Sequence, residues 1–375
     1  MRFLFASDSY KGSLSSQTVN QILADAAKQI FPDCVCDQVA IADGGEGTLE
    51  AFLSQKTGRR IEISVHDPLF RIRPASYAVS GDTAVICMAE ASGLPLLSEN
   101  ERNPLWTTTY GTGELILHAL QNGYKNIAIG IGGSATNDGG IGAMIALGAQ
   151  FLDVNGNPLR GIGNDLQSVA RIDLSKLSPL IQKAKFTIMC DVTNPLLGET
   201  GATYTYGPQK GATAEILPLL EAGMTNYAQH LNEVFQTDVQ TVRGGGAAGG
   251  LGAALKLFLN GEMQSGIDVL LDIAGFDELV AKADFVFSGE GRIDWQSANG
   301  KVLSGLGKRC QRAGKPLICI AGSLGKNFEE IYQQGVTAAF SILNKPMSLQ
   351  EAIDNSEKLL HATAESIFRI LKTNV

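Results

Sequence analysis

Five loops of the sequence gather residue types that bind anions, metal ions or small acids. Each loop combines glycine with aspartate, serine, asparagine or lysine, and each follows a short apolar run. Backbone amides and lysine ammonium groups suit anions, and carboxylates suit proton transfer or Mg²⁺. One such loop would be read as a turn, but five predict a site. The loops are SDSYKGSLSS (7–16), GIGGSATNDGG (130–140), DVTNPLLGETG (191–201), SGEGRIDWQS (288–297) and AGSLGKN (321–327).

The first loop places Asp8, Ser9 and Lys11 just before a predicted helix. A helix N-terminus with one lysine makes an anion site, and the alternative is a capped helix with a solvated lysine. Lys210, which stands between Gly207 and Gly211, is a second candidate for a phosphate contact. Residue types alone leave both alternatives open.

Carboxylates supply the chemistry of proton transfer and metal binding. Asp191 directly follows an apolar strand, where it can accept a proton from a substrate hydroxyl or hold a metal ion. The segment ADGGEGT brings Asp43 and Glu46 onto one glycine-rich loop that suits Mg²⁺. In SGEGRIDWQS, Arg292 can grip a carboxylate through two parallel hydrogen bonds, or it can simply pair with Asp294.

Known nucleotide motifs narrow the chemistry. The sequence contains no GxxxxGK[ST], which excludes a Walker A site. The stretch Gly130, Gly132, Ala135 matches GxGxxG/A, and Asp153 follows at about the spacing of a ribose-binding acid. However, SATNDGG is polar where a dinucleotide-binding helix would pack, so we predict binding of ATP rather than NAD. None of the four histidines lies in these loops, and the remaining residue types are those of phosphoryl transfer.

The elements around the loops predict an α/β protein. The apolar runs before the loops are continuous, as in parallel strands covered on both faces, and ligands bind beyond the carboxyl ends of such strands. Between residues 59 and 91 the pattern alternates, which predicts antiparallel strands. Apolar spacing predicts helices over 19–30, with Ser15 or Ser16 as N-cap, and over 349–371 as a packing helix.

Composition bounds the class of protein. A length of 375 residues favours two domains, and a net charge of −8 without a basic run argues against nucleic acid. No stretch of 18 apolar residues predicts a membrane span. Six cysteines without a CxxC pair predict buried thiols in a reducing cytoplasm.

Seven long motifs, in order, resemble glycerate kinase type 1. The resemblance runs from the first strand to at least Gly325. It is carried by DSYKGSLS (8–15), IADGGEGT (41–48), ERNPLWTTTYGTGELI (101–116), GIGGSATNDGG (130–140), DVTNPLLGETGATYTYGPQKGA (191–212), GGGAAGGLGAAL (244–255) and SGEGRIDWQSANGK (288–301).

The resemblance implies an ATP- and Mg²⁺-dependent kinase that phosphorylates D-glycerate, usually on the 2-hydroxyl, giving 2-phosphoglycerate. It also implies a flavodoxin-like domain made from both chain ends (1–66 and 285–375), an inserted mixed α/β domain (67–284) and a site in the cleft between them. The alternatives are an NAD-dependent dehydrogenase of a small hydroxy acid and a non-catalytic small-acid binding protein. Phosphorylation of the 2- or the 3-hydroxyl, the oligomeric state and the metabolic pathway stay open.

Within this frame the site residues divide by role. The predicted catalytic residues are Asp191, Lys11 and Asp294, and the predicted metal ligands are Asp43 and Asp191. The predicted substrate-binding residues are Asp8, Ser9 and Arg292. The predicted ATP-binding residues are Gly130, Gly132, Gly133, Ser134, Lys210, Gly289 and Glu290.

Four places depart from the pattern that the resemblance implies. Tyr10 stands where phenylalanine is usual, Phe70 where glycine is expected, and Cys87 where glutamate is common before MAEASG. The segment GIGNDL, which begins at Gly161, replaces a more glycine-rich stretch. Only Cys87 removes a charged motif residue, so the role of that position is open.

Overall fold

A computed structural model describes residues 1–41, 48–53, 58–298 and 301–373 of the chain. The chain divides into two compact units. Unit 1 comprises Met1–Asp43, Glu50–Gln55 and Ile267–Val375, and unit 2 comprises Gly44–Leu49 and Lys56–Gly266. Unit 1 is therefore built from both ends of the chain. The predicted metal ligand Asp43 lies outside the described residues.

The described residues of unit 1 form a five-stranded parallel sheet in the order β15-β13-β11-β1-β2. Counted along the chain within this sheet, the order is 2-1-3-4-5, which is the flavodoxin-like order. The topological switch point, where such folds bind ligands, is therefore between β1 and β11. The strands are β1 (Arg2–Phe5), β2 (Val35–Gln38), β11 (Phe285–Ser288), β13 (Leu317–Ala321) and β15 (Ala338–Ser341).

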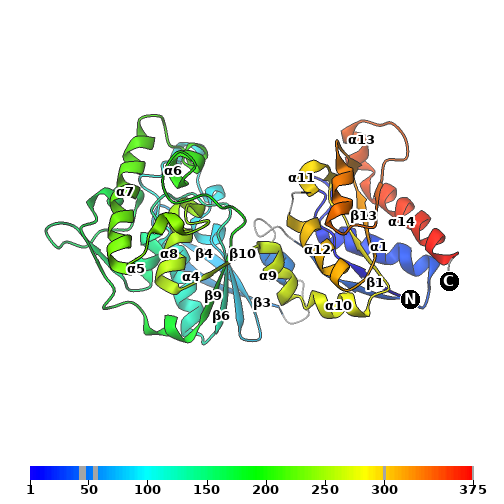
Figure 1. The fold of residues 1–375 in the computed structure, drawn as a ribbon, viewed down its shortest axis with the longest axis horizontal. Helices are drawn as coiled ribbons and strands as arrows, with labels where there is room; N and C mark the ends of the chain where they lie inside the picture. Colours follow the sequence, from blue (N-terminus) through cyan, green and yellow to red (C-terminus); the bar gives the residue numbers. More distant parts are fainter. Residues whose placement is uncertain (42–47, 54–57, 299–300, 374–375) are drawn as a thin grey trace. The chain divides into compact units, whose positions relative to one another are not determined.

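Both faces of this sheet are covered, which explains its continuous apolar strands. One face packs Phe3, Phe5 and Phe287 against α1 and α14, and Figure 1 shows these two helices side by side. The other face packs against α9, α10 and α12. The helices of unit 1 are α1 (Ser16–Ile30), α9 (Gly266–Ile273), α10 (Phe276–Lys282), α11 (Trp295–Ala298), α12 (Lys301–Arg312), α13 (Leu349–Asp354) and α14 (Ser356–Lys372), and two short strands, β12 (Arg292–Ile293) and β14 (Ser323–Leu324), pair with each other.

Unit 2 contains a mixed sheet in the order β10-β9-β6-β5-β4-β3 among its described residues. The pairs from β10 to β5 are parallel, whereas β4 pairs antiparallel with both β5 and β3. The strands are β3 (Arg59–His66), β4 (Ile72–Ser80), β5 (Thr83–Cys87), β6 (Asn126–Gly130), β9 (Lys185–Met189) and β10 (Glu262–Gln264), with β7 (Gln150–Leu152) and β8 (Arg171–Asp173) as a separate antiparallel pair.

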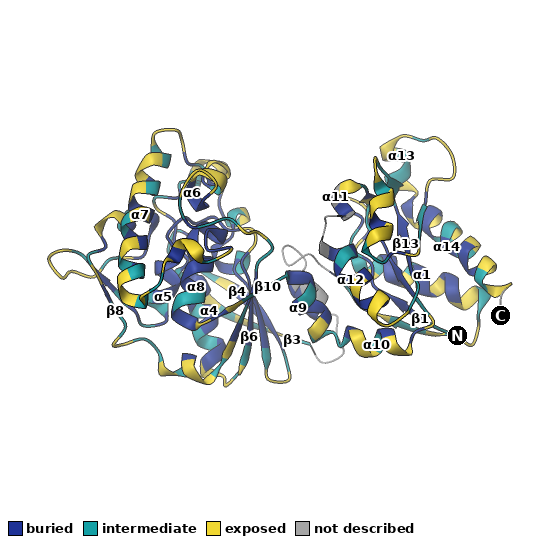
Figure 2. Ribbon diagram, in the orientation of Figure 1, coloured by how far each residue is buried: buried dark blue, intermediate teal, exposed yellow. Residues whose placement is uncertain are grey.

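Helices of small residues pack closely on the sheet of unit 2. A Cβ added at Gly113 in α4 would lie 2.3 Å from the carbonyl oxygen of Ala143 in α5, so these two helices approach backbone to backbone. Figure 2 shows the buried strands in dark blue beneath helices whose outer faces are exposed. The helices are α3 (Ala89–Ser92), α4 (Tyr110–Gln121), α5 (Ile141–Ala146), α6 (Ala202–Tyr206), α7 (Ile216–Phe235) and α8 (Leu251–Leu259), and α2 (Thr48–Leu53) has residues in both units.

The predicted α/β class with a parallel and a mixed sheet is confirmed. Each apolar run before a glycine-rich loop is a strand, and Ser15 is the N-cap of α1, accepting from the Thr18 amide at 3.1 Å. The helix predicted over 349–371 is instead two helices, because α13 ends at Asp354 and α14 begins at Ser356. Within the described residues, no helix is long and apolar enough to cross a membrane.

Candidate active site

Two predicted site loops meet at the switch point of unit 1. Asp8 and Ser9 follow β1, and Gly289 and Glu290 follow β11. The parallel pairing of these strands extends into the loops, since the Asp8 amide donates to the Gly289 carbonyl at 2.8 Å. The Ser9 amide in turn donates to Oδ1 of Asp8 at 2.6 Å. Residues about 280 positions apart in sequence, by the numbering, therefore share one edge of the sheet.

The loop after β11 lies tightly against the loop after β13. A Cβ at Gly289 would lie only 1.8 Å from the Ile320 carbonyl oxygen. The Gly322 amide donates to the Glu290 carbonyl, and the Ser323 amide donates to the Gly291 carbonyl, both at 3.1 Å. The first glycine of SGEGR is thus required by close backbone contact, and this contact holds Glu290 in place.

Glu290 has a strongly perturbed carboxyl group. Burial raises its pKa to about 7, a hydrogen bond from Ser297 opposes the rise, and the charges of Asp8 and Asp294 add to it, while Lys11 opposes it. Its buried Oε1 has no hydrogen-bond partner among the described residues. A carboxylate that titrates near neutral pH and keeps one acceptor atom unused is suited to taking a proton from a substrate.

Two predicted cations, Lys11 and Arg292, and the carboxylate of Asp294 lie around Glu290. Lys11 is exposed, and its charge favours the ionised form of Glu290. Arg292 has a side chain that is 65% exposed, and its Nε lies 3.3 Å from Oδ2 of Asp294. The guanidinium lies over Gly325, where an added Cβ would be 3.0 Å from Nε. The structure therefore brings together Asp8, Ser9, Lys11, Gly289, Glu290, Arg292 and Asp294.

In unit 2, the GIGGSATNDGG loop is not a dinucleotide-binding turn. In that motif a helix opens directly at the glycines. Here β6 ends at Gly130 and α5 begins only at Ile141, with ten residues of loop between them by the numbering. Gly132 and Gly133 are exposed, whereas Ser134 is buried and forms a bridge with Gly93. The backbone thus removes the motif on which the dehydrogenase alternative rests.

Asp138, which the sequence did not single out as a site residue, organises this loop. Its carboxylate is completely buried and accepts from the amide and hydroxyl of Thr109, at 2.8 and 2.7 Å, and from the amides of Gly140 and Gly142. Burial raises its pKa, and these hydrogen bonds oppose the rise. Asp138 therefore ties the starts of α4 and α5 together. The only sequence signal was its place in SATNDGG, which is polar where a dinucleotide-binding helix would pack.

Lys210 lies inside the protein, behind the same loop. Its Nζ donates to the Thr136 carbonyl at 2.7 Å, and the residue is 2% exposed. Burial lowers its pKa to about 7, against the attraction of Asp138. Among the described residues, the hydroxyl of Thr136 and Oδ1 of Asn137 are buried without a hydrogen-bond partner. The loop therefore has a buried lysine amine beneath it and unused polar atoms of its own.

Asp191 also belongs to unit 2 and follows β9. Its Oδ1 accepts from the Gly266 amide at 3.1 Å, and the side chain is partly exposed. Among the residues that the structure describes, no group of three His, Cys, Asp or Glu side chains is arranged to hold a metal ion.

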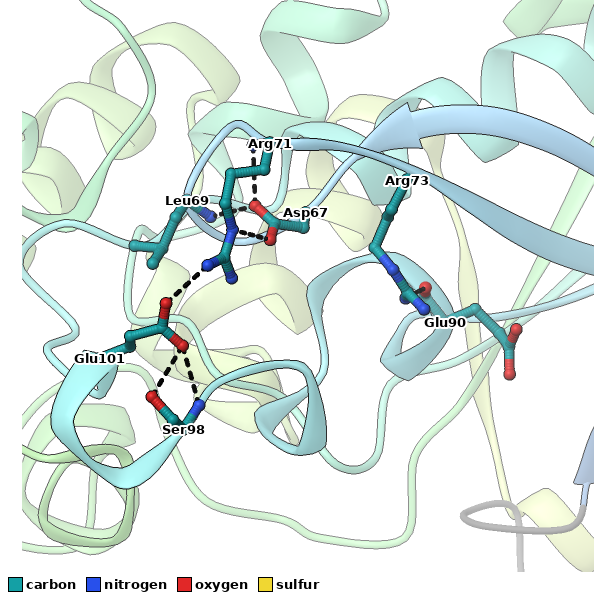
Figure 3. A network of polar contacts seen from close by, with 7 residues as sticks. All are labelled: Asp67, Leu69, Arg71, Arg73, Glu90, Ser98 and Glu101. Atoms are coloured by element: carbon teal, nitrogen blue, oxygen red, sulfur yellow. Dashed lines mark hydrogen bonds and ion pairs between the residues drawn. The ribbon is translucent and has the colours of Figure 1, made fainter.

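The ERNPLW motif is tied to the turn after β3 by an ion-pair network (Figure 3). Arg71 donates to Asp67 at 2.6 Å and to Glu101 at 2.5 Å, and Glu101 accepts from Ser98. The turn contains Phe70 at φ 62°, a left-handed conformation that favours glycine. The glycine expected here from the resemblance is therefore explained by the backbone, and the phenylalanine ring packs against Tyr110 at 5.8 Å between ring centroids.

Cys87, the position that usually carries glutamate, is buried at the end of β5. It pairs with Gly130 in the ladder, next to the GIGGS loop, and burial raises the pKa of its thiol to about 12. A neutral thiol therefore stands at the position where the resemblance leads us to expect a carboxylate.

The glycerate kinase family profile matches residues 3–372. The chain belongs to the glycerate kinase family. It is 45% identical over 354 residues to the glycerate 2-kinase of Escherichia coli, covering 94% of this chain and 93% of that protein. It is 43% identical over 366 residues to the glycerate kinase of Halalkalibacterium halodurans, covering 97% and 96% of the two chains.

A solved structure supports the same family. A chain assigned as glycerate kinase 2 of Salmonella typhimurium LT2 superposes with a TM-score of 0.90 at 42% identity, covering 100% of this chain and 99% of that one. The prediction of a glycerate kinase, a phosphotransferase with an alcohol acceptor, is confirmed.

Proposed function

We propose that the chain transfers the γ-phosphate of ATP to the 2-hydroxyl of D-glycerate, giving 2-phosphoglycerate. The proposal depends mainly on the surroundings of Glu290 at the switch point. One oxygen of its carboxylate is buried without a hydrogen-bond partner among the described residues, and the charges of Asp8, Asp294 and Lys11 act on it. The family supports the substrate, and the name of the E. coli relative, glycerate 2-kinase, supports the 2-hydroxyl.

Glu290 is the proposed base. A secondary hydroxyl is a weak nucleophile, so a carboxylate must accept its proton as the bond to phosphorus forms. A pKa near 7 makes Glu290 basic enough to take the proton and ionised enough to be available at neutral pH. The close contact of Gly289 with β13 fixes the backbone from which this carboxylate projects, and a base requires such a fixed position.

The cations around Glu290 would hold the acidic ends of the two substrates. Arg292 would grip the glycerate carboxylate, because its guanidinium is exposed and meets Asp294 only through a contact of 3.3 Å. Asp8 and Ser9 would orient the glycerate hydroxyls from the loop after β1. Lys11 would neutralise charge on the transferred phosphate, which is the main contribution of protein groups in phosphoryl transfer. Asp294 would keep Arg292 in position.

Asp191 is the proposed protein ligand of Mg²⁺. Such an ion is usually bound through one or two carboxylates together with substrate phosphates and water, so a group of three acidic residues is not needed. Asp191 is a partly exposed carboxylate at a strand end, and its oxygen atoms are suitable ligands for one coordination position of Mg²⁺. When bound, the ion neutralises phosphate charge and orients the phosphates. Asp43 stays a prediction.

The phosphates of ATP would also contact the GIGGS loop. Gly132 and Gly133 are exposed, so their backbone is accessible to an anion. Lys210 would act from beneath the loop by supporting the Thr136 carbonyl. The site between the domains and the cytoplasmic location that we expect from the sequence stay predictions.

A coupled assay tests the proposal. The chain is incubated with ATP, Mg²⁺ and D-glycerate, ADP release is followed, and the product is identified by phosphorus NMR. The expected product is 2-phosphoglycerate. Formation of 3-phosphoglycerate would correct the position of transfer, and an absence of glycerate-dependent ATP consumption, or turnover of NAD, would overturn the proposal.

A further inference from the structure

A cavity of about 340 Å³ lies beside the Glu290 cluster, within unit 1. Its walls come from segments that follow β1, β11, β13 and β15, so it lies at the carboxyl ends of neighbouring strands. Gly291 and Gly322 line it, and a Cβ at Gly322 would lie 2.3 Å from the Gly291 carbonyl oxygen. The floor is therefore closely packed backbone.

The opposite side of the cavity is formed by α13. Leu349, Ala352 and Ile353 of this helix line the cavity, yet the helix buries none of its residues, and Leu349 is 78% exposed. Figure 2 shows α13 without the dark blue of the core helices. Ser13 donates to Ser356 at 2.6 Å, which ties the start of α14 to the Lys11 loop. Apolar side chains thus face an open space that a ligand would cover favourably.

The lining combines an apolar wall with a single charge. Ile342, Leu343 and Met347 add to the apolar side, and serine hydroxyls provide hydrogen bonds. Of the described residues that line the cavity, Lys11 alone is charged. No carboxylate of the described residues is among them. Such a lining suits an anionic ligand with a large apolar part.

The two substrates of the proposed reaction differ in these properties. Glycerate is small, and each of its three carbons carries oxygen, so it gains little from an apolar wall. The volume of about 340 Å³ lies within the range of roughly 300–1,000 Å³ that is usual for pockets of larger ligands. A purine ring has flat apolar faces and a polar edge, and it belongs to a ligand with negative charge at the other end.

We propose that this cavity receives the adenine ring of ATP, with the phosphates leaving past Lys11 toward Glu290. The inference rests on the proposed function and deepens it, because it places the nucleotide base in a cavity whose lining joins residues of three glycine-rich loops to the apolar side chains of α13. Gly291 connects the two places, since it lines the cavity and directly follows Glu290.

Filling the cavity tests the proposal. Ala352→Phe adds a ring inside, and Gln350→Phe adds the same ring to an exposed position of the same helix that does not line the cavity. We expect Ala352→Phe to raise the KM for ATP by about tenfold or more, because a filled volume cannot admit a second ring. The KM for glycerate and the inhibition constant of inorganic tripolyphosphate should stay within about twofold, and Gln350→Phe should behave like the unaltered chain.

An unchanged KM for ATP in folded Ala352→Phe, or a rise for glycerate alone, would overturn the assignment. If that variant does not fold by circular dichroism, Ala352→Leu takes its place with the same criteria. If the unaltered chain transfers no phosphate to glycerate, the proposed function fails. ADP binding measured by calorimetry then tests separately whether the cavity receives adenine. Binding that is lost in the filled variant supports the assignment, and no binding to the unaltered chain overturns it.

Discussion

Replacing Glu290 with glutamine should make the protein more stable and inactive at the same time. The side chain is held largely out of water, and its Oε1 has no hydrogen-bond partner among the described residues, so its ionised form is unfavourable in the folded chain. Glutamine has nearly the same shape and no charge. A catalytic role would explain why the protein keeps a carboxylate that lowers its stability.

The size of the effect follows from the pKa of Glu290. A carboxyl pKa that rises from 4.5 to about 7 makes ionisation in the folded chain cost about 3 kcal/mol at pH 8, at about 1.4 kcal/mol per pH unit. Below pH 4.5 the group is protonated in both the folded and the unfolded chain, so nothing is lost there. Stability is lost as the pH rises from 4.5 through about 7. Because the side chain is not fully buried, we expect a gain of about 2–3 kcal/mol for Glu290→Gln at pH 8 and almost none at pH 4.5.

Urea unfolding at the two pH values measures the stability, and initial rates measure the activity. The kcat of Glu290→Gln should fall by roughly 10²-fold or more, and kcat/KM of the unaltered chain should rise with pH through about 7, as Glu290 ionises. Glu330→Gln, an exposed carboxylate of the same unit, is the control and should change neither quantity. A variant that is less stable at pH 8, or one that keeps most of its kcat, would refute the reasoning.

Further variants probe the other site residues. Asp191→Asn should lower kcat by about 10²-fold, with partial recovery at high Mg²⁺; no recovery would speak against a metal ligand. Arg292→Lys should raise the KM for glycerate more than that for ATP, because lysine keeps the charge and loses the planar fork; the opposite pattern would assign Arg292 to the phosphates. Asp138→Asn should destabilise unit 2 by about 2–4 kcal/mol in unfolding experiments, because an amide cannot accept all four hydrogen bonds. Phe70→Gly should be about 1 kcal/mol more stable than Phe70→Ala, since both lose the ring but only glycine tolerates φ 62°; equal stabilities would contradict strain at this turn.

The strands and their class were predictable because a buried parallel strand needs continuous apolar residues. β1, β6, β9, β11 and β13 all show this pattern, and all end where a glycine-rich loop begins. Domain bounds depend on pairing, which a local pattern does not show. β3 pairs along its length with β4 in the sheet of unit 2, whereas the boundary that we expect from the sequence follows residue 66. Similarly, helical spacing did not show the break at Asn355 or that α13 faces a cavity.

The loops of the site were predictable, but the roles within them were less so. Glycine, lysine and carboxylate types marked the loops, while burial and neighbours decide what each residue does. Gly289 is explained by a carbonyl 1.8 Å from its missing Cβ, and Lys210 by its place beneath the loop. Neither contact is local in sequence. The same holds for Glu290, whose pKa depends on Asp8, from the other end of the chain.

The distance in sequence between Asp8 and Glu290 has a consequence for how the site forms. Their loops are joined through the pairing of β1 with β11, so the carboxylate cluster cannot assemble until both ends of the chain are in one sheet. Bringing like charges together in a buried place is unfavourable and must be offset by the packing of that sheet. The packing is substantial, because Phe3, Phe5, Phe287 and Phe368 form one buried aromatic group, with Phe287 and Phe368 at 5.0 Å between ring centroids. The aromatic face of unit 1 thus supports a carboxylate that is unfavourable by itself and useful for proton transfer.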